Sequence, residues 1–151
     1  SCPAPAVGGE DPDQQLLSDE RLAAVGVPAL VMVGTNDQTT PVDPNVTRAW
    51  ELTGSAPHYR VELVDAQHQT FTDVCAYQAS FPSLPNVNPA VVEVIDDFAV
   101  AGCSVGDMAI PRAQDITNSF AVTFLDSVFG DTAMFTPDDY TIPDDITFLA
   151  K

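Results

Sequence analysis

The sequence predicts an α/β fold in which a parallel sheet is flanked by helices. Residues 28–34, PALVMVG, are apolar throughout and bounded by Pro and Gly, which is typical of a parallel strand buried on both faces. Residues 59–65, YRVELVD, show a second strand pattern, and a helix pattern separates the two. Because strand–helix–strand with short connections is a βαβ unit, we expect the two strands to be parallel.

Each predicted helix begins at a capping residue or a proline and ends at a glycine. These positions are Asp43, Pro44 and Gly54 for the helix between the strands, Asn88, Pro89 and Gly102 for the next, and Pro111 and Gly130 for the third. A short helix or turn that ends at Gly26 is expected before the first strand.

The composition along the chain divides it into three parts. Residues 1–15 are rich in Pro, Gly and Asp and are predicted to be a linker or a loop left by cleavage. Residues 16–131 hold the predicted strands and helices and form the expected domain. Residues 132–151 are punctuated by Pro and Asp, and we expect an extended tail over the surface. The chain starts at Ser1 without Met, as a processed subunit or a fragment would.

The charge excludes some partners. The 151 residues include 22 acidic residues against 5 basic ones, a net charge of −17. Such a surface repels phosphate backbones and anionic lipid, so no nucleic acid partner is expected. No apolar run is long enough for a membrane span. Strong acidity fits an extracellular or salty setting, but a solvated acidic surface is the favoured explanation.

The cysteines do not form a metal-binding pattern. Cys2, Cys75 and Cys103 show no C-x-x-C spacing, and the chain has 2 histidines, so neither a zinc site nor another cofactor is expected. In a secreted chain, three cysteines predict one internal pair and one cysteine left for another segment or partner.

The segment GCSVG, residues 102–106, matches the G-x-S-x-G pattern of a serine hydrolase's nucleophile elbow. A true elbow lies between a buried strand and a helix. Here a predicted helix precedes Gly102 and a loop follows, so Gly102 is explained as a helix stop. We therefore expect Ser104 to be a turn residue rather than a nucleophile.

Two polar residues follow the two strands at similar offsets. Asp37 stands three residues past Gly34, and His68 stands three residues past Asp65. Neighbouring parallel strands bring such loops to the same edge of the sheet, where α/β proteins bind ligands. A carboxylate there can orient an imidazole and stabilise its charged form. The alternative is that Asp37 caps a turn and His68 is an ordinary loop histidine. His58 precedes its strand and is expected to be a surface residue.

The segments GTNDQTTPV and VDAQHQTF resemble the C-terminal half of an α/β-hydrolase. The resemblance implies that Asp37 is the triad acid and His68 the triad base. A narrower likeness is to secreted dienelactone-hydrolase-like and platelet-activating-factor-acetylhydrolase-like esterases. In those, an aromatic residue and a Cys follow the His, another Cys comes later, and a helix closes the fold. The matching positions here are Phe71, Cys75, Cys103 and residues 116–131.

The resemblance also implies a Cys75–Cys103 disulfide and a missing part. In this family the nucleophilic Ser precedes the acid, yet no elbow lies upstream of Asp37. Two buried strands are moreover too few for a stable parallel sheet. We therefore expect a second polypeptide or an N-terminal segment to supply the nucleophile and the remaining strands.

The expected function is that of a secreted or periplasmic serine esterase or lipase-like hydrolase acting on carboxylic esters, of which this chain carries the acid and the base. Two alternatives stay open. A secreted serine aminopeptidase of the same fold also has a G-x-x-D segment, a His and later cysteines. A hydrolase-like module without activity could instead bind a partner.

Overall fold

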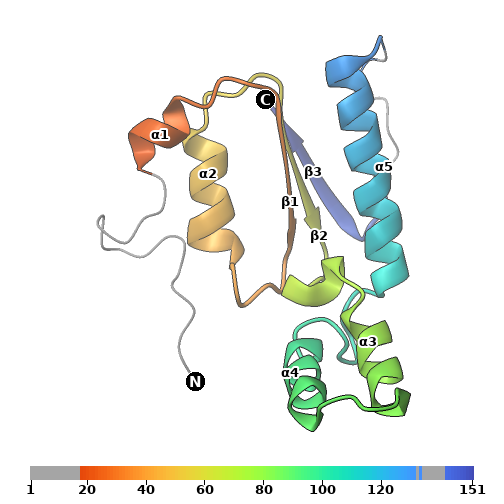
Figure 1. Cartoon of the computed structure of the whole chain (residues 1–151). Coiled ribbons are helices and arrows are strands. Elements are labelled where there is room, and N and C mark those ends of the chain that lie inside the picture. The colour runs from red at the N-terminus through yellow and green to blue at the C-terminus, as the bar shows by residue number, and fades with distance from the viewer. Residues whose placement is uncertain (1–17, 132, 134–141) are drawn as a thin grey trace.

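The computed structural model describes residues 18–131, 133 and 142–151. Short or irregular helical turns are called η, and Figure 1 labels the regular helices α and the strands β. The predictions for residues 1–15 and for Cys2 lie outside the described residues. The elements are α1 (Asp19–Ala23), β1 (Ala29–Gly34), η2 (Val42–Val46), α2 (Thr47–Leu52), β2 (His58–Leu63), η3 (His68–Phe71), α3 (Val74–Ser80), η4 (Phe81–Ser83), α4 (Pro89–Ala99), α5 (Ile110–Phe129) and β3 (Ile146–Ala150).

The described strands form one sheet in the order β1-β2-β3. Strand β1 pairs in parallel with β2, from Ala29 opposite His58 to Gly34 opposite Leu63, which confirms the predicted parallel pair. Strand β3 pairs with β2 in the antiparallel direction, and Leu63 lies opposite Ile146. The fold is therefore mixed α/β, and β1 and β3 are the edges of the described sheet.

Helices cover both faces of the sheet, with α2 on one side and α5 on the other (Figure 1). Because side chains alternate along a strand, β2 presents Tyr59, Val61 and Leu63 to α5. They form one buried cluster with residues of α5 and β3, namely Ala113, Ile116, Phe120, Ile146 and Phe148. On the opposite face His58 and Arg60 point toward α2, where Arg60 contacts Thr47.

The predicted helix boundaries are confirmed at the start of α4 and at the end of α5. Helix α4, however, ends at Ala99 with Val100 rather than Gly102 as its C-cap, and the N-cap of α2 is Val46 rather than Asp43. The side chain of Asn88 accepts a hydrogen bond from the Ala90 N–H at 3.0 Å and caps α4, with Pro89 in its first turn. Helix α5 has Pro111 in its first turn and Gly130 as its C-cap. Asp43 has extended backbone dihedrals (φ −100°, ψ 132°), and the chain becomes helical after it, through η2 into α2.

One strand and one regular helix were not predicted. The tail was expected to lie extended over the surface, but Ile146–Ala150 forms β3 and buries Ile146 and Phe148 in the core. Its apolar and polar residues alternate over too few positions to stand out in the sequence. Helix α3 occupies a stretch without a strong helix pattern. Helix α3 packs against α4, and the Cys75–Cys103 disulfide links it to the segment that follows α4. Tertiary contacts therefore stabilise this short helix.

The carboxyl ends of β1 and β2 point toward the same end of the molecule, where η3, α3 and α4 lie (Figure 1). Both loops that carry the predicted site residues are at this end. The fold thus places the loop after β1 beside the loop after β2, as expected for parallel neighbours.

Candidate active site

The loops after β1 and β2 are hydrogen-bonded to each other. The Thr35 N–H donates to the Leu63 carbonyl at 3.0 Å, and the Asn36 N–H donates to the Ala66 carbonyl at 3.0 Å. In return, the Asp65 N–H donates to Thr35 Oγ1 at 3.0 Å. These bonds continue the parallel pairing past the ends of the strands, so the positions of Asp37 and His68 are coupled through the backbone.

Asp37 is buried, with 5% of its surface exposed, and its carboxylate accepts several hydrogen bonds. The backbone N–H groups of Thr39 and Thr40 donate to Oδ1 at 2.8 and 2.7 Å. The Thr40 hydroxyl donates to Oδ2 at 2.8 Å. Burial by itself would raise the pKa of the Asp37 carboxyl, but the hydrogen bonds from Thr40, His68 and Thr39 outweigh it and hold that pKa below its ordinary value. The group is therefore a carboxylate at neutral pH.

His68 begins η3, and its Nδ1 lies 3.0 Å from Asp37 Oδ2, so the predicted contact between these two side chains is present. The pairing of Nδ1 with a carboxylate assigns the proton of the neutral imidazole to Nδ1. The His68 side chain is 38% exposed. Within the described part of the chain, Nε2 has no hydrogen-bond partner.

This arrangement can perform general acid–base chemistry. A buried carboxylate holds the imidazole by Nδ1 and stabilises the positive charge that forms when Nε2 takes a proton. Nε2 is the nitrogen that can act, because Nδ1 is bound to Asp37. In this geometry a hydroxyl or a water at Nε2 of His68 could give up its proton to that nitrogen.

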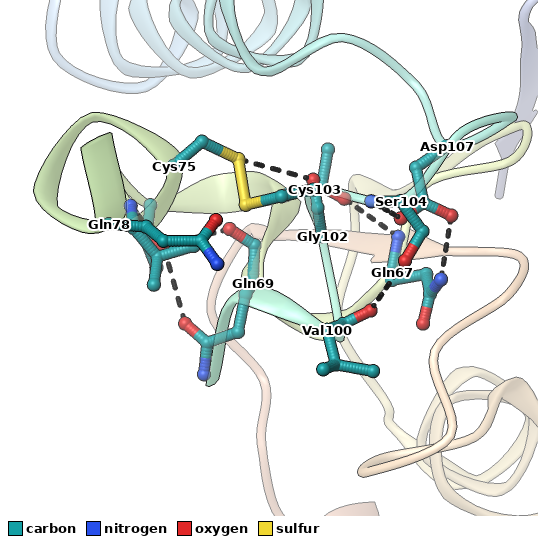
Figure 2. Close-up of a disulfide and its surroundings, with 12 residues drawn as sticks. Gln67, Gln69, Cys75, Gln78, Val100, Gly102, Cys103, Ser104 and Asp107 are labelled. Atoms are coloured by element: carbon teal, nitrogen blue, oxygen red, sulfur yellow. Dashed lines mark hydrogen bonds between the residues drawn. A yellow bond between two sulfur atoms is a disulfide. The ribbon is translucent and has the colours of Figure 1, made fainter. Parts of the chain in front are cut away.

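The GCSVG segment lies against the His68 loop (Figure 2). A Cβ atom on Gly102 would lie 2.7 Å from the Gln69 carbonyl carbon and 2.8 Å from the Thr70 nitrogen, so a glycine is needed for this approach. The Gln69 N–H donates to the Ala101 carbonyl at 2.7 Å. Gln67 Nε2 donates to Asp107 Oδ1 at 2.6 Å. The segment therefore holds the loop that carries His68.

The predicted disulfide is confirmed. Cys75 in α3 and Cys103 in the GCSVG segment have an S–S distance of 2.03 Å and Cα atoms 5.7 Å apart. The bridge closes a loop of the chain that runs from α3 through α4 to the GCSVG segment. Figure 2 shows the bonded sulfur atoms. The bridge thus links α3, which follows the His68 loop, to the segment whose Gly102 packs against that loop.

Ser104 serves the turn after α4. Its hydroxyl donates to the Val100 carbonyl at 3.1 Å, and its N–H donates to Asp107 Oδ2 at 2.9 Å. No strand precedes it, since α4 ends at Ala99 and the turn follows directly. These contacts explain why a serine stands at position 104 without any role as a nucleophile.

The expectation that His58 lies on the surface is wrong. His58 is the first residue of β2 and only 1% exposed, with its ring 4.5 Å from that of Trp50. Burial, and secondarily the positive charge of Lys151, lowers the pKa of His58. The strand begins one residue earlier than predicted and places this side chain under α2, away from the edge that carries Asp37 and His68.

Three polar residues at the site were missed by the sequence reasoning. Thr40 could have been found, because an Asp side chain commonly accepts hydrogen bonds from residues two and three positions later in a turn, here Thr39 and Thr40. Gln67 and Asp107 are 40 residues apart, and no sequence signal links them. The described residues contain no group of three His, Cys, Asp or Glu side chains that could hold a metal ion.

Among the described helices, none is both long and apolar enough to cross a bilayer. Comparisons of the chain with protein-family models, with curated proteins and with solved structures found no match. Any assignment of function therefore depends on the geometry of the site and on the residues themselves.

Proposed function

We propose that this chain carries the acid and the base of a secreted serine hydrolase with an α/β-hydrolase fold, acting on carboxylic esters. The observation that supports it most is the hydrogen bond between Asp37 and His68 at the carboxyl edge of two parallel strands, with Nε2 left available. In the proposed roles His68 is the general base and acid, and Asp37 orients it.

The reaction follows from these positions. A serine hydroxyl at Nε2 of His68 attacks the ester carbonyl while Nε2 takes its proton. The imidazolium, stabilised by Asp37, then returns the proton to the leaving alcohol, and a water repeats the cycle to release the acid. The nucleophile comes from outside the described residues, on an N-terminal segment or a second polypeptide. This chain without that part is inactive.

Features of the sheet support the proposal that a further polypeptide segment completes it. Among the described strands, β1 pairs with β2 alone, and its sequence ALVMVG is apolar although its first four residues are only half-buried. Helix α5 also exposes Val122, Leu125 and Phe129 along one stripe. Parallel sheets are normally buried on both faces, so an additional strand at β1 with its own helices would cover these groups.

The proposed location is extracellular or periplasmic. The Cys75–Cys103 disulfide is stable in an oxidising compartment, and the net charge of −17 keeps an exposed protein dispersed. Neither observation concerns the substrate.

Labelling with a fluorophosphonate probe tests the proposal. The chain is purified together with any polypeptide that accompanies it, and the labelled residue is identified by mass spectrometry. We expect a labelled Ser in a strand–G-x-S-x-G–helix segment outside residues 18–131. Asp37→Asn and His68→Gln should each reduce the rate of labelling by at least about a thousandfold. Asp43→Asn is the matched control, because Asp43 is an exposed acid in the same connection.

Two results would contradict the proposal. Absence of labelling from the complete assembly would favour a binding module without activity, and labelling of Ser104 would overturn the assignment of the nucleophile. Turnover of aminoacyl anilides in preference to simple esters would instead indicate an aminopeptidase with the same acid and base.

A further inference from the structure

The hydroxyl of Thr40 lies between the two candidate catalytic side chains. Its Oγ1 is 2.8 Å from Asp37 Oδ2 and 3.4 Å from His68 Nδ1, while Nδ1 and Oδ2 are 3.0 Å apart. The three atoms therefore form a closed triangle of polar contacts. Thr40 is half-buried, and Asp37 is 5% exposed.

The number of protons in this triangle fixes their places. A threonine hydroxyl has one proton, and the geometry assigns it to the bond with Oδ2, which as a carboxylate oxygen can only accept. Toward Nδ1 the Thr40 oxygen can then only accept. Nδ1 must therefore carry a proton, which it donates to both neighbours. The contact with Asp37 Oδ2, at 3.0 Å, is shorter than the contact with Thr40 Oγ1, at 3.4 Å.

The other tautomer is disfavoured by the same contacts. With the proton on Nε2, the Nδ1 lone pair would face Oδ2, and the single hydroxyl proton could serve only one of them. One acceptor in a largely buried site would then lack a donor, which costs free energy. Asp37 alone would disfavour this tautomer, but its carboxylate must also be kept from rotating.

Thr40 restrains that rotation. The backbone N–H groups of Thr39 and Thr40 bind Oδ1, and the Thr40 hydroxyl binds Oδ2, so both oxygens of Asp37 are held by one turn of the chain. Because Thr is β-branched, its χ1 is restricted, which limits the positions that its Oγ1 can take. The hydroxyl thus acts on Asp37 and on His68 together.

We propose that Thr40 is a positioning residue that fixes His68 in the Nδ1–H tautomer and keeps Nε2 unprotonated for proton transfer. The tautomer itself follows from the triangle. Its importance for turnover rests on the proposed hydrolase function. Thr40 touches neither the ester nor the reacting atoms, and it acts through Asp37 and His68.

Nitrogen NMR of the imidazoles tests the tautomer without any need for activity. The chain contains 2 histidines, so His68→Gln identifies the signals of His68 in a sample labelled with ¹⁵N-histidine. In the neutral form of the imidazole, the parent and Thr40→Ser should show the proton on Nδ1. Thr40→Val has nearly the same shape but no hydroxyl, and its Nε2–H share should rise severalfold. Shifts in Thr40→Val that equal those of the parent, in a folded protein, would overturn the proposal.

Steady-state kinetics of the complete assembly test the consequence. Thr40→Val should lower kcat by about tenfold with KM nearly unchanged, as expected when one charge-assisted hydrogen bond is lost. Thr40→Ser should stay within about twofold of the parent, since it keeps the hydroxyl. Equal kcat values for Thr40→Val and the parent would overturn the role in turnover. A parent that hydrolyses no ester would reject the proposed function, while the NMR result would still decide the tautomer.

Discussion

The carbonyl oxygen of Ala66 occupies the space in which a side chain on Gly34 would begin. A Cβ atom there would lie 2.3 Å from the Ala66 oxygen and 2.6 Å from its carbonyl carbon, both backbone atoms that cannot rotate away. Gly34 ends β1 and Ala66 follows β2, so this contact sets the separation of the two loops that carry Asp37 and His68.

Gly34→Ala should therefore destabilise the protein by about 1–3 kcal/mol, because one backbone must move to admit the methyl group. Urea unfolding measures the change. Gly26→Ala is the matched control, since no atom lies within 4 Å of its added Cβ, and it should change stability by less than about 1 kcal/mol. Similar effects of the two substitutions would show that the contact at Ala66 is not restrictive.

The pairing of Asp37 with His68 could be predicted because each step depended on local sequence. An apolar strand, a capped helix and a second strand specify a parallel pair, and parallel strands fix which loops share an edge. The offsets of Asp37 and His68 past the strands then needed no knowledge of the rest of the chain. The caps at Asn88 and Gly130 were equally local.

Features that depend on distant segments could not be predicted. Strand β3 forms because Ile146 and Phe148 pack in the core between β2 and α5. His58 is buried because α2 brings Trp50 over it. The bond from Gln67 to Asp107 requires the segment after α4 to return to η3. In each case long-range packing, rather than a residue's own propensity, decided the outcome.

Removal of the disulfide should lower stability and loosen the loop that carries His68. The double substitution of Cys75 and Cys103 by Ser releases a constraint across a sequence separation of 28 residues. In the chain-entropy account this costs about 3–4 kcal/mol. Hydrogen exchange of residues 66–71 should also become faster, because Gln69 is held by the same segment.

A reducing agent provides the matched control for that experiment. It should destabilise the parent by a similar amount and leave the double variant unchanged. If the double variant unfolds at the same urea concentration as the oxidised parent, and exchange at residues 66–71 is unaltered, the disulfide does not restrain the loop.

Ser104→Ala should leave any esterase activity within about a few-fold of the parent, because the hydroxyl only bonds the exposed turn after α4. The loss of that single bond should cost no more than about 1 kcal/mol. Gly102→Ala, two residues earlier, should be clearly more harmful, since its methyl group would meet the backbone of Gln69 and Thr70. A thousandfold loss of activity in Ser104→Ala would instead identify it as the nucleophile.

The buried position of His58 makes the stability of the fold dependent on pH. Its pKa lies below the ordinary value of 6.5 in the folded protein because of burial and the nearby charge of Lys151. Between the folded and unfolded pKa values the unfolded chain binds the proton that the folded chain excludes. The contribution of His58 to stability is thus complete above about pH 6.5 and is lost as the pH falls toward the folded pKa.

Urea unfolding between pH 7.5 and 5.5 should therefore show a free energy of unfolding that falls as the solution becomes more acidic, by at most about 1.4 kcal/mol per pH unit from this residue. His58→Gln should reduce this slope, whatever its effect on absolute stability, because glutamine does not titrate. His68→Gln is the control and should keep the part of the slope that His58 contributes. Asp37 and Asp145, whose pKa values are lowered, titrate at more acidic pH and do not affect this range. An equal slope in the parent and in His58→Gln would mean that His58 accepts its proton in the folded protein as readily as in the unfolded chain.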